Sequence, residues 1–473
     1  MEQARQKMSS ARMGEMPEGR LLLSLSVPMM LSMLVQALYN VVDSIYVARV
    51  SEDCLAALSL AFPAQNIMIG LGTGTGVGVG TLISRALGRH DREEAARVAG
   101  TSVFLALCCW ALMALFGLLG ARGFVHSQTA VASIGNYAES YLRIVTIASL
   151  FLYLQMCMER LLQSTGQTRL SMWTQMAGAL TNILLDPFFI FKTGDLLEFG
   201  GLSIRMPFGL GLATAGAALA TVAGQAVAAC VGLALHTAKN RELPIRVREI
   251  RPHKRIIGEV YRIGFPSILM MVLASVTNFI MNLILGAFEA VGATAVAVYG
   301  VYFKIQSFFF MPVFGLNSGM IPVIGYNYGA RKLDRIHRTI LWAVIYATCF
   351  MLLGLLLFQL APRWLLSTLF DASGNLLEIG VHALRRISPS FLFAGFCIVA
   401  GSACQALGRS TLSFIVSVLR QVVGLIPAAW LLSLTGDVNM VWWCFPIAEI
   451  ISVAASAFFL RSALRGVERE LRA

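Results

Sequence analysis

Runs of about 20 or more apolar residues recur along almost the whole chain, and no other feature limits its fold as strongly. A helix of this length crosses the roughly 30 Å hydrocarbon core of a bilayer. The pattern therefore predicts a protein that crosses the membrane many times. The twelve predicted spans are residues 21–48, 54–84, 97–120, 131–158, 169–192, 208–236, 259–286, 293–326, 339–361, 376–403, 410–434 and 440–462.

The composition leaves no room for a soluble domain. Hydrophobic residues make up 57% of the 473 residues and charged residues only 13%, whereas soluble domains carry about 25% charged residues. Inside a bilayer, backbone groups must be paired within the protein, so apolar spans of this length are helices. We therefore predict an all-α membrane protein with twelve transmembrane helices and the lipid bilayer as its surroundings.

The second span carries a glycine at every other position from Gly70 to Gly80, in the stretch GLGTGTGVGVG. The G-x-G-x-x-G spacing of a dinucleotide-binding loop is absent from it, and an open strand is excluded inside the bilayer. On a helix, these glycines form two nearly opposite stripes at which neighbouring helices can approach closely. Tight packing and a helix that slides or bends both remain open.

The net charge of +12 follows from membrane topology. With the N-terminus placed in the cytoplasm, most basic loop residues fall on the cytoplasmic side. This distribution is the positive-inside rule, and it predicts a multi-pass protein with both termini in the cytoplasm. No basic patch with interleaved aromatic residues lies outside the short loops, so nucleic acid is not an expected partner.

The chain contains an internal duplication. The stretch VPMMLSMLVQALYNVVD in the first half corresponds to FPSILMMVLASVTNFIM in the second, and QSTGQTRLS corresponds to QALGRSTLS. Six helices in each half make the repeat parallel, and repeat interfaces are where transport proteins bind their substrates. The predicted parts are a cytoplasmic segment 1–20, an N-lobe 21–236, a linker loop 237–258, a C-lobe 259–462 and a cytoplasmic tail 463–473.

Ionisable residues inside membrane spans are costly, so each marks a candidate site. Asp43 and Asp186 lie in helices that run outward, and they fall at similar depths. Other polar side chains near their faces are Gln36, Tyr39, Asn40 and Asn182. Three interpretations remain open: oxygen ligands for a hard cation such as sodium, a carboxyl that carries a proton, and two separately satisfied polar residues.

The second half lacks these two acids, since Asp43 corresponds to Met281 and Asp186 to Ala428. Any ion site is therefore expected to be confined to the N-lobe. Charges embedded in the C-lobe spans include Lys304, Arg420 and Glu449. For the two basic residues we expect a structural role, with repulsion of cations as the alternative.

Resident cofactors and disulfides are not expected. The nine cysteines lie mostly inside apolar spans, without C-x-x-C spacing. The six histidines lie mainly in or near loops, and none pairs with another at helical spacing. Neither a zinc site nor a disulfide framework is indicated by these patterns.

Several stretches resemble the multidrug and toxic compound extrusion (MATE) family over essentially the full chain. They include PMMLSMLVQALYNVVDSIYVARV, TNILLDPFFIF, GLATAGAALATVAGQ and YFKIQSFFFMPVFGLNSGMIPVIGYNYGAR. The pair Asp186 and Pro187 within N-x-x-x-D-P is the most specific of these signals. The resemblance implies two six-helix lobes around a central cleft. It also implies a bacterial transporter that exchanges sodium ions or protons for organic, often cationic, compounds.

The resemblance assigns roles to particular residues. It implies a cation-coupling site, with sodium as one candidate ligand, formed by Asp43, Asn182, Asp186 and Thr221. Residues implied to line or support the substrate cleft are Gln36, Tyr39, Asn40 and Glu159. Pro28 matches a proline at which the first helix bends in some members, whereas a first-turn proline would cause no kink.

We therefore expect a monomeric secondary antiporter in the bacterial cytoplasmic membrane. It exports small organic compounds, cationic or amphiphilic, by alternating access, in exchange for protons or sodium ions. One alternative is a lipid-linked saccharide flippase of the same superfamily, against which the N-lobe acids argue. A remote alternative is an intramembrane aspartyl protease using Asp43 and Asp186, but its G-x-G-D motif is absent, so an enzyme is not expected.

Overall fold

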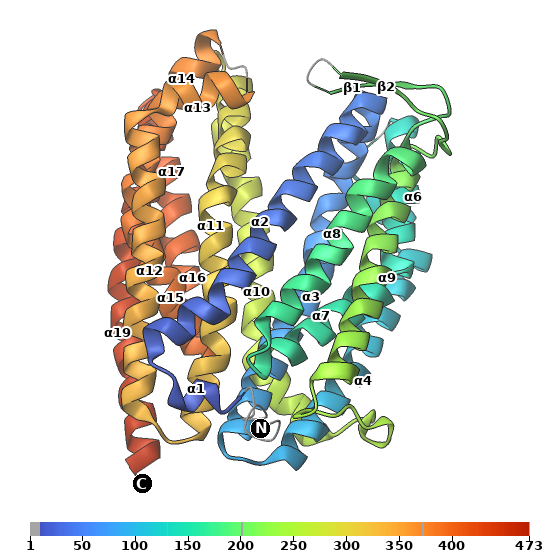
Figure 1. Cartoon of the computed structure of the whole chain (residues 1–473). Coiled ribbons are helices and arrows are strands. Elements are labelled where there is room, and N and C mark those ends of the chain that lie inside the picture. Colours follow the sequence, from blue (N-terminus) through green and yellow to red (C-terminus); the bar gives the residue numbers. More distant parts are fainter. Residues whose placement is uncertain (1–9, 130, 200–201, 371–372, 473) are drawn as a thin grey trace. The chain divides into compact units, whose positions relative to one another are not determined.

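The computed structural model describes residues 10–129, 131–199, 202–370 and 373–472, and almost all of them are helical (Figure 1). The helices of the first half are α1 (Arg12–Glu15), α2 (Glu18–Val50), α3 (Glu52–Gly88), α4 (Arg92–Leu119), α5 (Ala121–His126), α6 (Ala132–Ile147), α7 (Leu150–Ser164), α8 (Thr168–Ile190) and α9 (Thr214–Lys239). Those that follow are η2 (Val247–Glu249), α10 (Lys254–Gly286), α11 (Gly292–Gly329), α12 (Leu333–Leu360), α13 (Pro362–Phe370), α14 (Gly374–Ile387), α15 (Pro389–Ala406), α16 (Ser410–Val418), η3 (Leu419–Leu425), α17 (Ile426–Ser433), α18 (Val438–Val441) and α19 (Cys444–Arg472).

Ten helices within the described ranges are long and apolar enough to cross a membrane, and the bent pair α6 and α7 gives an eleventh span. The remaining predicted span is α8, which has 23 residues. It is less apolar than the others because it carries Gln175, Asn182 and Asp186. Each predicted span thus has a helix, or an interrupted helix, at its place, and the all-α membrane fold is confirmed.

Two spans are interrupted at equivalent positions of the repeat. In the first half, α6 ends at Ile147 and α7 begins at Leu150, with a bend of 47° between them. In the second half, α14 ends at Ile387 and α15 begins at Pro389. The predicted spans 131–158 and 376–403 therefore each contain two helices. A continuous apolar run does not report such a break in the backbone.

Two short elements and one extension were not predicted. The connection from α8 to α9 carries an antiparallel hairpin of β1 (Leu196–Phe199) and β2 (Leu202–Arg205). The last helix, α19, continues to Arg472, through most of the segment expected to be a tail. Hydropathy marks only the part of a helix that lies in lipid, so the polar ends of long helices are missed.

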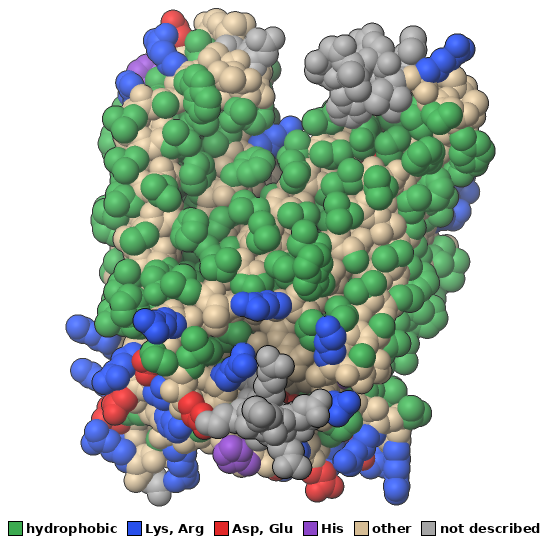
Figure 2. Space-filling model, in the orientation of Figure 1, with side chains coloured by type: hydrophobic (Ala, Val, Ile, Leu, Met, Phe, Trp, Pro, Cys, Tyr) green, Lys and Arg blue, Asp and Glu red, His purple; other side chains and the backbone are tan. Residues whose placement is uncertain are grey.

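The surface matches a membrane protein. On the face drawn in Figure 2, hydrophobic side chains cover the middle of the helices. Most Lys and Arg side chains on this face gather at the end where α19 finishes. The nine cysteines are free thiols.

The chain forms two compact units. The N-unit comprises Leu31–Ile83 and Asp91–Tyr261, and the C-unit comprises the segment up to Met30, Ser84–His90 and the chain from Arg262 onward. Both α2 and α10 are therefore divided between units, α2 shortly after Pro28. The lobe limits at residues 236 and 259 stay a prediction.

The segment before α2 is held by side chains of the C-unit. Arg335 of α12 donates to the carbonyl oxygens of Met13 (3.3 Å) and Met16, and it pairs with Glu18 at 3.2 Å. Asn327 of α11 donates to the Met13 carbonyl at 2.9 Å. The start of the first long helix is thus fixed to helices of the second half.

The segment before α10 is held in the corresponding way by the N-unit. His253 Nδ1 and Thr101 Oγ1 of α4 are 2.9 Å apart, and His253 Nε2 lies 3.3 Å from a Glu249 carboxyl oxygen. A Cβ on Gly100 of α4 would lie 2.5 Å from the Glu249 carbonyl oxygen, so only glycine admits this approach. Each lead-in segment is therefore held by helices of the other half.

The glycine run of α3 packs against neighbours on two sides, as predicted. A Cβ on Gly72 would lie 2.5 Å from the Met156 sulfur of α7. A Cβ on Gly78 would lie 2.2 Å from the carbonyl oxygen of Val260 in α10. Small residues thus let α3 approach both helices closely.

Candidate functional site

The predicted cation site is built on the close pairing of α8 and α9, which lie side by side in the N-unit (Figure 1). A Cβ on Gly224 of α9 would lie 2.7 Å from the carbonyl oxygen of Gly178 and 3.2 Å from Cβ of Asn182, both on α8. Facing glycines let the two backbones approach closely. Asn182, one turn before Asp186, is thereby placed against α9.

Asn182 is hydrogen-bonded to two of the other predicted ligands. Its Nδ2 donates to Oδ1 of Asp186 and to Oγ1 of Thr221, both at 3.4 Å. Asp186 is fully buried, and only 3% of Asn182 is exposed. Because the amide nitrogen makes these bonds, the Asn182 oxygen is left over, and it is buried without a hydrogen-bond partner in the described chain.

Asp43 of α2 belongs to the same group. Its carboxyl lies close enough to Asp186 for the two charges to interact. Oδ1 of Asp43 and Oδ2 of Asp186 are both buried, and neither has a hydrogen-bond partner among the described residues. Together with the Asn182 oxygen, the site holds three buried acceptor oxygens that no donor in the described part of the chain satisfies.

Polar residues on the face of α2 lie beside Asp43, as their spacing predicts. The Tyr39 hydroxyl is hydrogen-bonded to Gln36 and interacts electrostatically with Asp43. The Asn40 side chain, in contrast, is exposed. Of these side chains, Gln36 and Tyr39 are therefore placed to support the acid.

Tyr141 and Gln65 are two further residues of the site that no sequence pattern indicated. Tyr141 of α6 interacts electrostatically with both Asp43 and Asp186. Its hydroxyl accepts a hydrogen bond of 2.8 Å from Gln65 of α3. Neither residue lies in a motif, so only their polarity within apolar spans could have marked them.

Glu159 lies in an adjoining hydrogen-bonded network. Gln155 donates to one carboxyl oxygen at 2.9 Å, and Gln175 of α8 donates to the other at 2.7 Å. Ser32 of α2 in turn donates to the Gln175 oxygen. Both oxygens of Glu159 are therefore satisfied, whereas each of the two aspartates has one buried oxygen without a hydrogen-bond partner in the described residues. Tyr39 interacts electrostatically with Glu159 as well.

Pro28 lies inside α2, ten residues after the helix begins at Glu18. The alternative of a first-turn proline is therefore wrong. An interior proline removes one helical hydrogen bond and crowds the preceding turn, which favours a kink. Bending of α2 at this residue stays a prediction.

The donor set suits a hard cation or a proton. The four predicted ligands offer carboxylate, amide and hydroxyl oxygens, which are the ligands that hard cations prefer. No group of three or more His, Cys, Asp or Glu side chains that could hold a metal occurs within the described ranges. The oxygen atoms of the four predicted ligands are of a kind that fits sodium or a proton.

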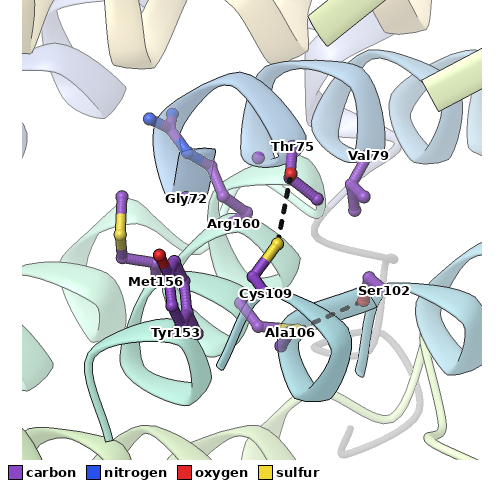
Figure 3. A pocket seen from close by; sticks show the side chains of 11 residues that line it. Gly72, Thr75, Val79, Ser102, Ala106, Cys109, Tyr153, Met156 and Arg160 are labelled. Atoms are coloured by element: carbon purple, nitrogen blue, oxygen red, sulfur yellow. Dashed lines mark hydrogen bonds between the residues drawn. The ribbon is translucent and has the colours of Figure 1, made fainter. Parts of the chain in front are cut away.

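A separate small cavity lies between α3, α4 and α7 (Figure 3). Its volume of about 20 Å³ has room for about one water molecule. Thr75 and Cys109 point toward each other across it, with 4.0 Å between oxygen and sulfur. The cavity is too small for an organic substrate, and none of the four predicted ion ligands lines it.

Comparison with known proteins places the chain in a family. The family model described as MatE matches residues 28–188 and again residues 266–430. The chain belongs to the MatE family. The family model matches once in each half of the chain, which confirms the predicted duplication. MatE proteins are transporters, which confirms the prediction that this chain is not an enzyme.

Curated MatE relatives cover nearly the full chain. "Multidrug export protein MepA" of Staphylococcus saprophyticus is 26% identical over 454 residues, which is 94% of this chain and 95% of the relative. The protein of the same name from Staphylococcus haemolyticus is 27% identical over 442 residues, 92% of each chain. Both relatives are named multidrug export proteins, and they support the prediction of a multi-pass membrane transporter.

Solved MatE structures show the same fold. A structure titled as the outward-facing conformation of a multidrug resistance MATE family transporter has a TM-score of 0.88 at 24% identity, covering 97% of this chain and 98% of that chain. A transporter of the MOP superfamily from Pyrococcus furiosus, with a binding pocket described as of reverse polarity, has a TM-score of 0.87 at 24% identity and the same coverage. These likenesses support the two repeated six-helix lobes.

Proposed function

We propose that this MatE protein is a secondary antiporter that exports organic, cationic or amphiphilic compounds in exchange for protons or sodium ions. It works by alternating access as a monomer in a bacterial cytoplasmic membrane, with both termini in the cytoplasm. Relatives named multidrug export proteins support small organic substrates. The cytoplasmic orientation rests on the distribution of basic loop residues.

One observation carries the exchange part of the proposal. Asp43, Asn182 and Asp186 hold three buried acceptor oxygens for which the described residues offer no donor. Each unsatisfied buried group costs about 1–3 kcal/mol, and the two carboxylates also repel each other. A bound cation or proton removes both costs, so binding of the ion lowers the free energy of the site.

The size of this change suits coupling. An ion moves a conformational equilibrium from 1:99 to 99:1 only if its affinities for the two states differ by about 5.5 kcal/mol. Three groups at about 1–3 kcal/mol each cover that difference if only one state gathers the oxygens around the ion. The conformation without the gathered oxygens is then the one that binds the organic substrate for export.

The test is efflux from proteoliposomes under an imposed pH gradient or an imposed sodium gradient, applied separately. We expect one of the two gradients to drive export of an organic cation such as ethidium. Asp43→Asn is expected to abolish gradient-driven export while the protein stays folded, because an amide cannot release a proton or supply full negative charge to sodium.

Glu139→Gln is the matched control. Glu139 is an acid of the N-unit that pairs with Arg143 at 3.1 Å and lies outside the candidate site. This variant is expected to export at the normal rate. Gradient-driven export by Asp43→Asn at the rate of the unmodified protein contradicts the proposal.

A further inference from the structure

The C-unit holds an ion pair that the proposed exchange does not use. Arg420 Nε donates to Glu449 Oε2 of α19 at 3.0 Å. Only 1% of the Glu449 side chain is exposed, compared with 35% of that of Arg420. Lys304, the other basic residue predicted to be embedded in this half, is exposed. Because Glu449 neutralises the charge of Arg420, Arg420 does not act as an isolated positive charge that repels cations.

Arg420 lies in an irregular part of its helix. The segment η3 (Leu419–Leu425) is a π-helix, and Pro427 follows it at the start of α17. Proline cannot donate the helical hydrogen bond and crowds the residue four positions earlier, which accounts for the widened turn. Segments of this kind are frequent at functional sites.

Glu449 is only partly satisfied by its partner. Its second oxygen, Oε1, is buried without a hydrogen-bond partner in the described part of the chain. An Arg–Glu pair kept only for stability is expected to satisfy both oxygens, because a half-satisfied buried carboxylate is costly. The unsatisfied oxygen therefore indicates that Glu449 can bind a second group in addition to Arg420.

Two tyrosines that interact electrostatically with Arg420, Tyr299 and Tyr302, belong to a packed group of aromatic rings. Tyr302 of α11 interacts electrostatically with both Arg420 and Glu449. Its ring lies 5.6 Å from that of Phe445 and 5.6 Å from that of Phe303. We call Tyr299, Tyr302, Phe303 and Phe445 the aromatic cluster; the ring of Tyr299 is 4.8 Å from that of Phe303.

We infer that Glu449 and the aromatic cluster form a binding site for organic cations, and that Arg420 occupies it as an internal competitor until a substrate cation replaces it. Aromatic faces attract organic cations, and a buried carboxylate supplies the opposite charge. Replacing one cation by another keeps the buried site neutral, so the exchange avoids leaving Glu449 uncompensated. The Arg420 side chain is 35% exposed on the protein, so its guanidinium is not enclosed on every side.

This inference rests on the proposed export of organic cations and adds a substrate-binding acid in the half that lacks the N-unit aspartates. Ion and substrate would then be bound by different acids. In that arrangement, loss of Glu449 weakens substrate binding, whereas loss of Asp43 removes the ion coupling.

The test is equilibrium binding to the purified full-length protein in detergent, without an ion gradient. The probes are tetraphenylphosphonium, an aromatic cation, and triphenylphosphine oxide, a similar but neutral molecule. We expect Glu449→Gln to weaken tetraphenylphosphonium binding by about ten- to a hundredfold, since an interaction with a charged group contributes about 1.5–3 kcal/mol and about 1.4 kcal/mol is tenfold. Binding of the neutral probe should not change.

Arg420→Gln gives the opposite expectation, because it removes the competitor: tetraphenylphosphonium should bind more tightly than to the unmodified protein. Glu139→Gln serves again as the control, because this acid lies outside the proposed site, and it should bind both probes normally. Unchanged tetraphenylphosphonium binding in Glu449→Gln overturns the inference. Equal weakening of both probes in Glu449→Gln, or weaker cation binding in Arg420→Gln, also overturns it.

A double variant keeps the test usable if either single variant fails to fold. Arg420→Met combined with Glu449→Leu replaces the pair by apolar side chains, a change that buried ion pairs often tolerate. It should lose tetraphenylphosphonium binding selectively, and normal binding of this cation would overturn the inference. Failure of gradient-driven export while Glu449-dependent binding persists would instead count against the proposed antiport alone.

Discussion

A single added methyl group at the contact of α8 and α9 should disturb the candidate ion site. In Gly224→Ala, the new Cβ would lie 2.7 Å from the Gly178 carbonyl oxygen. Carbon–oxygen contacts begin near 3.3 Å, so the helices must separate by about 0.6 Å. The bond from Asn182 to Thr221 is already 3.4 Å long, and this separation breaks it.

The expected cost combines two opposing effects. Overpacking costs about 1–3 kcal/mol, while alanine in place of a helical glycine gains about 0.5–1 kcal/mol. We therefore expect Gly224→Ala to lower the unfolding temperature and to weaken affinity for the coupling ion. Gly258→Ala is the matched control, because no atom lies within 4 Å of the position of its Cβ.

Two assays separate these effects. Thermal unfolding in detergent reports the packing cost, and the ion concentration needed for half-maximal export reports the site. If Gly224→Ala matches Gly258→Ala in both assays, the close approach of α8 and α9 does not position Asn182, and the reasoning fails.

Two further predictions concern the C-unit. Arg335→Gln should lower the free energy of unfolding by about 3 kcal/mol, because it leaves the buried carboxylate of Glu18 unpaired; thermal unfolding checks this, and an unchanged midpoint would contradict it. Gly88→Ala should destabilise the protein more than Gly300→Ala, since the first Cβ would lie 2.0 Å from a backbone oxygen of α11 and the second would meet nothing within 4 Å. Equal unfolding temperatures of the two variants would show that this approach can relax freely.

Hydropathy predicted the fold well because it is a local property. Every apolar run corresponds to helical structure, and even α8 was recognised although its polar residues make it the least apolar span. Of these polar residues, Asp186 was predicted from the cost of placing a charge in the membrane, and Asn182 from its place near the same helix face. The structure then brings them together with Thr221, which only the family resemblance had indicated.

Other features depend on contacts between distant parts of the chain, and sequence periodicity does not report these. Arg420 and Glu449 were each recognised as embedded charges, but nothing in their spacing indicated that they pair. Tyr141 meets the aspartates only because α6 lies near them. The lead-in segments are short and polar, so nothing local marked Arg335 as the residue that holds one of them.

The exchange of lead-in segments has a consequence for the origin of the chain. The segment before the first long helix is fastened by Arg335 and Asn327 in the second half, and the segment before α10 is fastened by α4 in the first. A polypeptide of half this length would have no place of its own for its leading arm. A half-length chain that fastened its leading arm in this way would have to exchange arms with a second copy.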